Sequence, residues 1–158
     1  MIGTLRRNLL AALLPALCCS LLIVTSSLAQ AQAPAPSGKT GKLIVNIAGI
    51  RNTDGNIRVA VRTNETTIAA AQIASVDPKT LTGKAVFDSL PEGDYGIAVF
   101  HDENQNEKLD FNDYGMPLEG YGHSNNPAKR QGPPDFSETR FIFAAPTTSI
   151  TINLVYWP

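Results

Sequence analysis

The stretch "GKAVFDSLPEGDYGIAVFHD", residues 83–102, decides the fold class of this chain. Apolar and β-branched residues run through both of its halves, 83–90 and 94–102, and a short turn containing Pro91 and Gly93 separates them. Short runs that are rich in Val, Ile and Phe and are bounded by Pro and Gly are typical of β-strands. We therefore expect two strands joined by a tight turn.

Similar patterns precede this stretch. Residues 42–50 are rich in β-branched side chains, and residues 57–63 alternate apolar with polar side chains, which is the period of a half-buried strand. The dipeptide Asp54-Gly55 between them favours a hairpin turn, so we expect the two strands to form a hairpin or to be near neighbours. Residues 66–75 are rich in alanine but lack an apolar stripe, which leaves a short helix or an irregular edge strand.

The end of the chain repeats the strand pattern. Residues 139–145 and 148–157 flank Pro146 and are expected to form a closing hairpin. In the last strand, alternation places four apolar side chains on one face, namely those of Ile150, Ile152, Leu154 and Tyr156.

Six to eight short strands separated by turn signals predict an all-β fold, an antiparallel β-sandwich. Residues 103–137 carry no strand pattern, and an ordered loop of that length is uncommon unless it is functional or tied down. We expect a core formed by Val45, Ile47, Val59, Val61, Val86, Phe87, Ile97, Val99, Phe141, Phe143, Ile152 and Leu154.

The N-terminus has the order of a secretory signal peptide: basic residues, an apolar run and small residues. We assign residues 1–31 to the signal peptide, 32–41 to a flexible Pro/Ala/Gly-rich leader and 42–158 to one domain. Cleavage sites of the A-x-A type end at Ala29 and Ala31. The alternative is an uncleaved membrane anchor, because the apolar run is nearly long enough to span a bilayer.

Cleavage would leave a single domain without cysteine. Both cysteines of the 158-residue chain lie within residues 1–31, so a disulfide framework, a thiolate metal site and a cysteine nucleophile are excluded from the remaining 127 residues. The formal net charge changes from −1 to −3 when Arg6 and Arg7 are removed, and no basic patch for nucleic acid is present. We expect the protein in the periplasm, on the outer surface or in the medium, without a membrane span after cleavage.

Oxygen-bearing side chains recur at regular spacing directly after the strand that ends at Asp102. Counted from Asp102, they occupy positions one, three, five, nine and twelve, which is the spacing of a calcium loop. Calcium takes six to eight oxygen ligands, and an all-protein oxygen cage suits it better than Mg²⁺. The predicted ligands are Asp102, Asn104, Asn106, Asp110 and Asp113, together with the backbone carbonyl of Lys108.

Two other interpretations of this region stay open. Position six of a calcium loop is usually glycine, whereas this chain has Glu107, so the loop could instead be an Asn/Asp-rich turn whose side chains bond to their own backbone. His101 and His123, with Glu119 or Asp102, could form a zinc site. His101, Glu119 and His123 could also serve a small metal-dependent hydrolase. The simpler interpretation of His101 is a structural hydrogen bond at the end of the strand.

The stretch "PLEGYGHSNN", residues 117–126, offers polar groups of the kind that recognise sugars or peptides. We therefore consider a module that binds a cell-surface glycan or protein. Its predicted ligand-binding residues are His101, Glu119, Tyr121, His123, Ser124, Asn125 and Asn126.

These motifs resemble the signature of a family of secreted bacterial proteins classed as a domain of unknown function. The matching patterns are H-D-x-N-x-N-x-x-x-D at 101–110, G-x-P-x-E-G-Y-G-x-S-N-N at 115–126 and G-P-P-x-F at 132–136. The corner "FDSLPEGDY", residues 87–95, is similar to one in prealbumin-like and collagen-adhesin B-type β-sandwich modules, which implies an Ig-like or prealbumin-like sandwich. Some modules of that kind carry calcium-binding loops.

Together, these observations favour an exported, non-enzymatic β-sandwich with a calcium-binding loop, which could recognise a cell-surface ligand. The alternatives are a glycan- or protein-binding module without metal and a small metal-dependent hydrolase.

Overall fold

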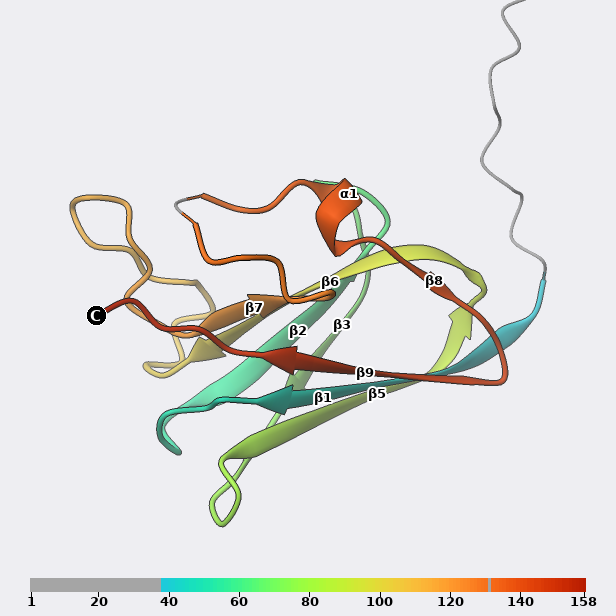
Figure 1. The fold of residues 1–158 in the computed structure, drawn as a ribbon. Coiled ribbons are helices and arrows are strands. Elements are labelled where there is room, and N and C mark those ends of the chain that lie inside the picture. The colour runs from blue at the N-terminus through green and yellow to red at the C-terminus, as the bar shows by residue number, and fades with distance from the viewer. Residues whose placement is uncertain (1–37, 131) are drawn as a thin grey trace, which may run out of the picture. The chain divides into compact units, whose positions relative to one another are not determined.

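The computed structural model describes residues 38–130 and 132–158, and these residues form the predicted β-sandwich (Figure 1). The predicted signal peptide, 1–31, and most of the predicted leader lie outside the described residues. The first strand begins at Thr40, two residues before the predicted start of the domain. No helix within the described part of the chain is long and apolar enough to cross a membrane.

Two sheets pack face to face. The four-stranded sheet has the order β4 (Val76–Asp77), β5 (Thr82–Pro91), β1 (Thr40–Ala48) and β9 (Thr147–Asn153). The second sheet has the order β3 (Ile68–Ala74), β2 (Asn56–Arg62), β6 (Gly93–Asp102) and β7 (Tyr121–His123), and β8 (Phe141–Phe143) pairs with the other end of β6. One short helix, α1 (Phe136–Thr139), lies against β6 in the described part.

The core lies between the sheets and confirms most of the predicted set. Val86 and Phe141 are only partly buried, because Val86 faces away from the interior on β5 and Phe141 lies at the margin of the core. The other predicted core residues are buried: Val45, Ile47, Val59, Val61, Phe87, Ile97, Val99, Phe143, Ile152 and Leu154.

Neither predicted hairpin forms: the strands in question are not paired with each other. β1 and β2 belong to different sheets, since β1 pairs with β5 and β9, and β2 pairs with β3 and β6. Gly55 does adopt a left-handed φ of 63°, but a Cβ there would lie 1.8 Å from the carbonyl oxygen of Asp102. This glycine therefore permits a close approach to the end of β6 and does not form a two-residue hairpin turn.

The last two strands also separate into different sheets. β8 joins β6, whereas β9 runs parallel to β1, so the sandwich is mostly but not wholly antiparallel. The shared face of the last strand is confirmed, because Ile152 and Leu154 are buried and Ile150 and Tyr156 pack against the core.

The alanine-rich segment forms the edge strand β3, so the strand alternative is correct. From this edge, Gln72 reaches across to the other sheet. Its Nε2 donates to the carbonyl of Val86 at 2.6 Å, and its Oε1 accepts from the Val86 N–H at 3.0 Å. The carboxamide thus satisfies backbone groups at an open edge of β5, which would otherwise be free to pair with another chain.

The turn at residues 91–93 carries the chain from one sheet to the other. Tyr95 is buried, and its hydroxyl donates to the carbonyl of Pro91 at 3.0 Å. Burial raises the pKa of this hydroxyl, which keeps it protonated as a donor. The contact resembles the tyrosine corner of other sandwiches, in which a tyrosine bonds back to the backbone a few residues upstream.

Tyr95→Phe removes this hydrogen bond without changing the packed ring. We expect the free energy of unfolding to fall by about 1 kcal/mol, the usual net contribution of one such bond. Urea denaturation followed by circular dichroism measures the change. Ile142→Val, a conservative change at an exposed strand residue, serves as the control. Equal effects of the two substitutions would contradict a structural role for the corner.

Candidate functional site

The long segment after β6 begins at the side chain of Asp102, which is fully buried with 0% exposure. Its Oδ1 accepts the Asn106 N–H, and its Oδ2 accepts the Glu107 N–H, both at 3.0 Å. The Nε of Arg58, on the neighbouring strand β2, donates to Oδ2 at 2.6 Å. The Asp102 carboxylate therefore fixes the turn and forms an ion pair with an arginine of the sheet.

Glu107 makes the turn for which a calcium loop usually employs glycine. Its φ is 69°, and Gln105, two residues earlier, also has a positive φ of 58°. A left-handed conformation costs a non-glycine residue roughly 1–2 kcal/mol. The hydrogen bond to Asp102 and an ion pair from Arg58 Nη2 to Glu107 at 3.1 Å offset this cost.

The loop brings together the side chains of Asp102, Asn104, Asn106 and Asp110. The Asn104 carboxamide donates to Asp110 at 2.6 Å, and the Asn106 carboxamide donates to both Asp110 oxygens at 3.0 and 2.9 Å. Asn104 Oδ1 accepts the Asn106 N–H, and Asn106 Oδ1 accepts the Lys108 N–H. The backbone bonds expected of an Asn/Asp-rich turn are therefore present, and the two carboxamides direct their N–H groups at Asp110.

Asp113, predicted at the twelfth position, does not join this group. It is exposed and lies in a second turn, where Asn112 Oδ1 accepts the N–H groups of Tyr114 and Met116. Within the described residues its side chain makes no hydrogen bond or ion pair. The chain reverses here because Phe111 and Pro117 form a bridge, so Asp113 is carried away from the loop.

Glu119 is the second carboxylate that organises the loop, a role that sequence reasoning missed. It is 5% exposed; its Oε1 accepts the Glu103 N–H at 2.9 Å, and its Oε2 accepts the Asp110 N–H at 3.2 Å. One side chain thus fastens both ends of the loop. Its place in the G-x-P-x-E-G motif was the only sequence signal for this role.

His101 has the structural role of the simpler interpretation. Its ring is fully buried, and its Nε2 lies 2.7 Å from the carbonyl oxygen of Asp54. Because a carbonyl only accepts, Nε2 carries the hydrogen. Nδ1 is 2.9 Å from the Tyr156 hydroxyl, so the ring ties the C-terminal segment to the end of β6.

Most of the side chains predicted to bind a ligand form hydrogen bonds within the chain. Ser124 is fully buried; its Oγ accepts the Ile97 N–H at 2.8 Å and donates to the carbonyl of Thr139. The Asn125 carboxamide donates to the carbonyls of Glu138 and Arg140, and Asn126 bonds to the backbone of Thr151 and Asn153. Of the predicted set, Tyr121, His123 and Asn126 line cavities.

The two histidines do not come together. His101 lies on the interior face of β6, whereas His123 is paired with Ala98 on the opposite face. Within the described ranges, no group of three or more His, Cys, Asp or Glu side chains is placed to hold a metal ion. The zinc and hydrolase alternatives therefore lack an assembled centre in this part of the chain.

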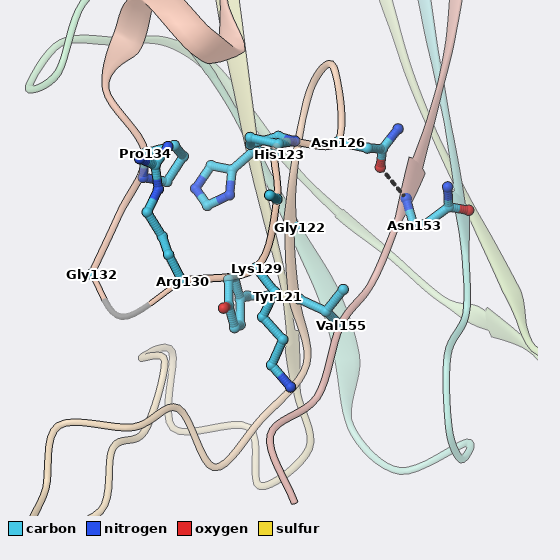
Figure 2. A pocket seen from close by; sticks show the side chains of 12 residues that line it. Tyr121, Gly122, His123, Asn126, Lys129, Arg130, Gly132, Pro134, Asn153 and Val155 are labelled. Atoms are coloured by element: carbon cyan, nitrogen blue, oxygen red, sulfur yellow. Dashed lines mark hydrogen bonds between the residues drawn. The ribbon is translucent and has the colours of Figure 1, made fainter.

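Tyr121 and His123 project from the outer face of the second sheet and separate two cavities. One, of about 90 Å³, lies beside residues 126–130, Gly132 and Pro134, and Figure 2 shows Arg130 and Pro134 next to the His123 ring. The other, of about 230 Å³, lies between β6 and the loop. The pKa of His123 is lowered to about 4, mainly by burial of the ring and further by the positive charges of Arg62 and Arg130.

This lowered pKa predicts a specific dependence of stability on pH. Because the unfolded chain protonates His123 near 6.5 and the folded chain only near 4, folding loses stability as the pH falls from about 6.5 to 4. His123→Gln should flatten that part of the profile by about 2–3 kcal/mol. Urea unfolding at a series of pH values measures the difference. Parallel profiles of the two proteins would contradict a neutral folded His123.

These features define a class of protein: a small β-sandwich whose outer sheet face is covered by a long loop held by buried polar side chains. A family model described as "uncharacterized protein conserved in bacteria (DUF2141)" matches residues 45–151. The chain belongs to this family. No curated protein and no solved structure matches this chain.

Proposed function

We propose that the protein is an exported, non-enzymatic β-sandwich module that binds a calcium ion in the loop between Asp102 and Asp110. One observation carries the proposal. The left-handed turn at Glu107 gathers the four side chains at the first, third, fifth and ninth positions into one cluster. Two carboxylates and two carboxamides are hard oxygen donors of the kind that calcium prefers.

The charge balance of the loop supports a cation. Arg58 pairs with Asp102, and Arg51 pairs with Glu103 at 2.6 Å, but no lysine or arginine pairs with Asp110 within the described residues. Asp102 Oδ1 accepts only one hydrogen bond, so it keeps an acceptor site. A calcium ion would be held by Asp102, Asn104, Asn106 and Asp110, with the Lys108 carbonyl as a further donor. The ion would pair with the negative charge of Asp110, which no lysine or arginine neutralises within the described residues.

The side-chain oxygen of Asn56, beside the loop, supports the same proposal. Asn56 is paired with Asp102 across the β2–β6 ladder. Its Oδ1 is buried and has no hydrogen-bond partner among the described residues. A buried oxygen without a partner costs about 1–3 kcal/mol, and a cation or its bound water would satisfy it.

Arg58 limits the expected affinity, because its guanidinium already neutralises part of the charge on Asp102. We expect a dissociation constant of about 10⁻⁴–10⁻³ M, the range of extracellular calcium modules. At about ten times that concentration, calcium would stabilise the folded protein by about 1.4 kcal/mol. That gain orders a loop and does not create the fold.

Calorimetric titration with calcium, together with thermal melting, tests this proposal. The full-length chain is expressed, and the protein is purified in the form that the host cell produces. We expect sub-millimolar to millimolar binding and a rise in melting temperature of about 5 °C in saturating calcium. Asp110→Asn should abolish both, because it removes the unpaired charge at nearly constant volume. Asp113→Asn is the matched control and should leave both unchanged, because Asp113 lies outside the cluster.

The absence of binding heat and of a melting shift would reject the calcium site and leave a loop held by its own hydrogen bonds. Loss of binding in Asp113→Asn would refute the assignment of ligands. An equal response to magnesium would show that the loop does not provide the flexible cage that distinguishes the larger ion.

Export rests on the pattern of residues 1–31. Intact mass measurement of the protein from the periplasmic fraction of a bacterial host should find the chain without the residues up to Ala29 or Ala31. Recovery of only the full-length chain in the membrane fraction would favour the uncleaved anchor.

A further inference from the structure

The outer face of the five-stranded sheet is built from small and aromatic side chains. The strand register places Phe100 beside Arg58 on one side and Tyr121 on the other. The next row across the sheet consists of Ala71, Ala60, Ala98 and His123. Because alanines are short, this row forms the floor of a shallow groove between larger neighbours.

The loop converts one end of this groove into a cavity of about 230 Å³. Apolar side chains from the sheet and from the loop line it: Phe100, Leu109, Phe111, Pro117 and Tyr121. Phe111 remains 55% exposed at the rim, although it is a large apolar residue. A volume of that size holds about eight water-sized groups, since one water occupies about 30 Å³. The cavity therefore fits a small apolar body.

The end of the cavity at His123 carries one arginine, Arg130, in its lining. Arg62 lies on the same outer face but outside the cavity, where its charge still acts on the His123 ring. Nη2 of Arg130 pairs with Glu138, and the other donors of its guanidinium remain for a ligand. His123 stays neutral and offers a hydrogen bond without attracting a cation. This end favours an anion.

We propose that the cavity binds a small amphipathic carboxylate, with its acyl or aryl portion against Phe100, Leu109 and Phe111 and its carboxylate toward Arg130. A guanidinium is the side chain best suited to a carboxylate, because its fork of donors matches the two oxygens. Few polar groups and a mainly apolar lining are typical of small-molecule sites. This site is separate from the calcium ligands, although the loop supplies one of its walls.

Octanoate is the probe, with octanol and acetate as matched controls that lack the charge and the apolar chain, respectively. Trp157 is the chain's only tryptophan, and its Nε1 donates to the Tyr121 hydroxyl at 3.0 Å, so its fluorescence reports on the cavity wall. We expect octanoate to bind with a dissociation constant on the order of 10⁻⁴ M. Octanol should bind about tenfold more weakly, and acetate should not bind measurably.

Variants of the full chain separate the two ends of the site. Arg130→Gln should weaken octanoate about tenfold and leave octanol unchanged, because only the charge contact with the ligand is lost. Phe111→Ser should weaken both ligands. Lys84→Gln, on the other sheet, is the control for removal of an exposed positive charge and should change neither. Circular dichroism spectra and melting temperatures like those of the unmodified protein establish that the variants are folded.

Titrations with calcium chloride and with a chelator keep this proposal distinct from the calcium proposal. Octanoate binding in the chelator would support the cavity even if the loop bound no calcium. Equal affinities for octanoate and octanol, or an Arg130→Gln variant with unchanged octanoate affinity, would overturn the anion preference. No fluorescence change and no binding heat with octanoate in either condition would overturn the site.

Discussion

The structure beyond β6 depends on one buried carboxylate, that of Asp102. A buried charge is strongly unfavourable unless it is paired and hydrogen-bonded. Arg58 supplies the opposite charge from the adjacent strand, and the backbone of the loop supplies two N–H donors. The chain must therefore curl back to the end of the strand it has just left, and Glu107 must take a left-handed conformation to do so. The cluster of oxygen-bearing side chains follows from that turn.

Polar side chains also organise the rest of the long segment, where regular strand pairing is sparse. Ser124 satisfies the backbone of β6 beyond the three-residue pairing with β7, and Glu119 ties together the two ends of the loop. Phe136 covers Gly96 on β6, where a Cβ would lie 3.1 Å from its ring. Side chains that appear available for ligands in the sequence are therefore used to satisfy buried backbone groups, as a long irregular segment requires.

Periodicity in the sequence predicted the faces of the strands but not their partners. Alternation correctly placed Val59, Val61 and Ile152 in the core, and the unpatterned alanine segment proved to be an edge strand. The alternation of apolar and polar side chains along a strand does not depend on which strand is its partner. Each strand was therefore expected to pair with the strand nearest to it in the sequence. The parallel pairing of β1 with β9 joins opposite ends of the domain and has no local signal. At the loop, regular spacing located four clustered side chains, whereas Arg58 and Glu119 act from outside the motif and depend on tertiary contacts.

The loop and the apolar cavity share structural elements, and this sharing has a thermodynamic consequence. Leu109 lines the cavity and immediately precedes Asp110, whose carboxylate receives the carboxamides of Asn104 and Asn106. Any ligand that packs against Leu109 therefore favours the ordered loop, and any cation that orders the loop favours the cavity wall. Such coupling is reciprocal, because each ligand must change the affinity of the other by the same factor. Since Asp102 and Glu119 hold the loop through hydrogen bonds to its backbone, we expect this factor to be modest if both proposed sites bind their ligands.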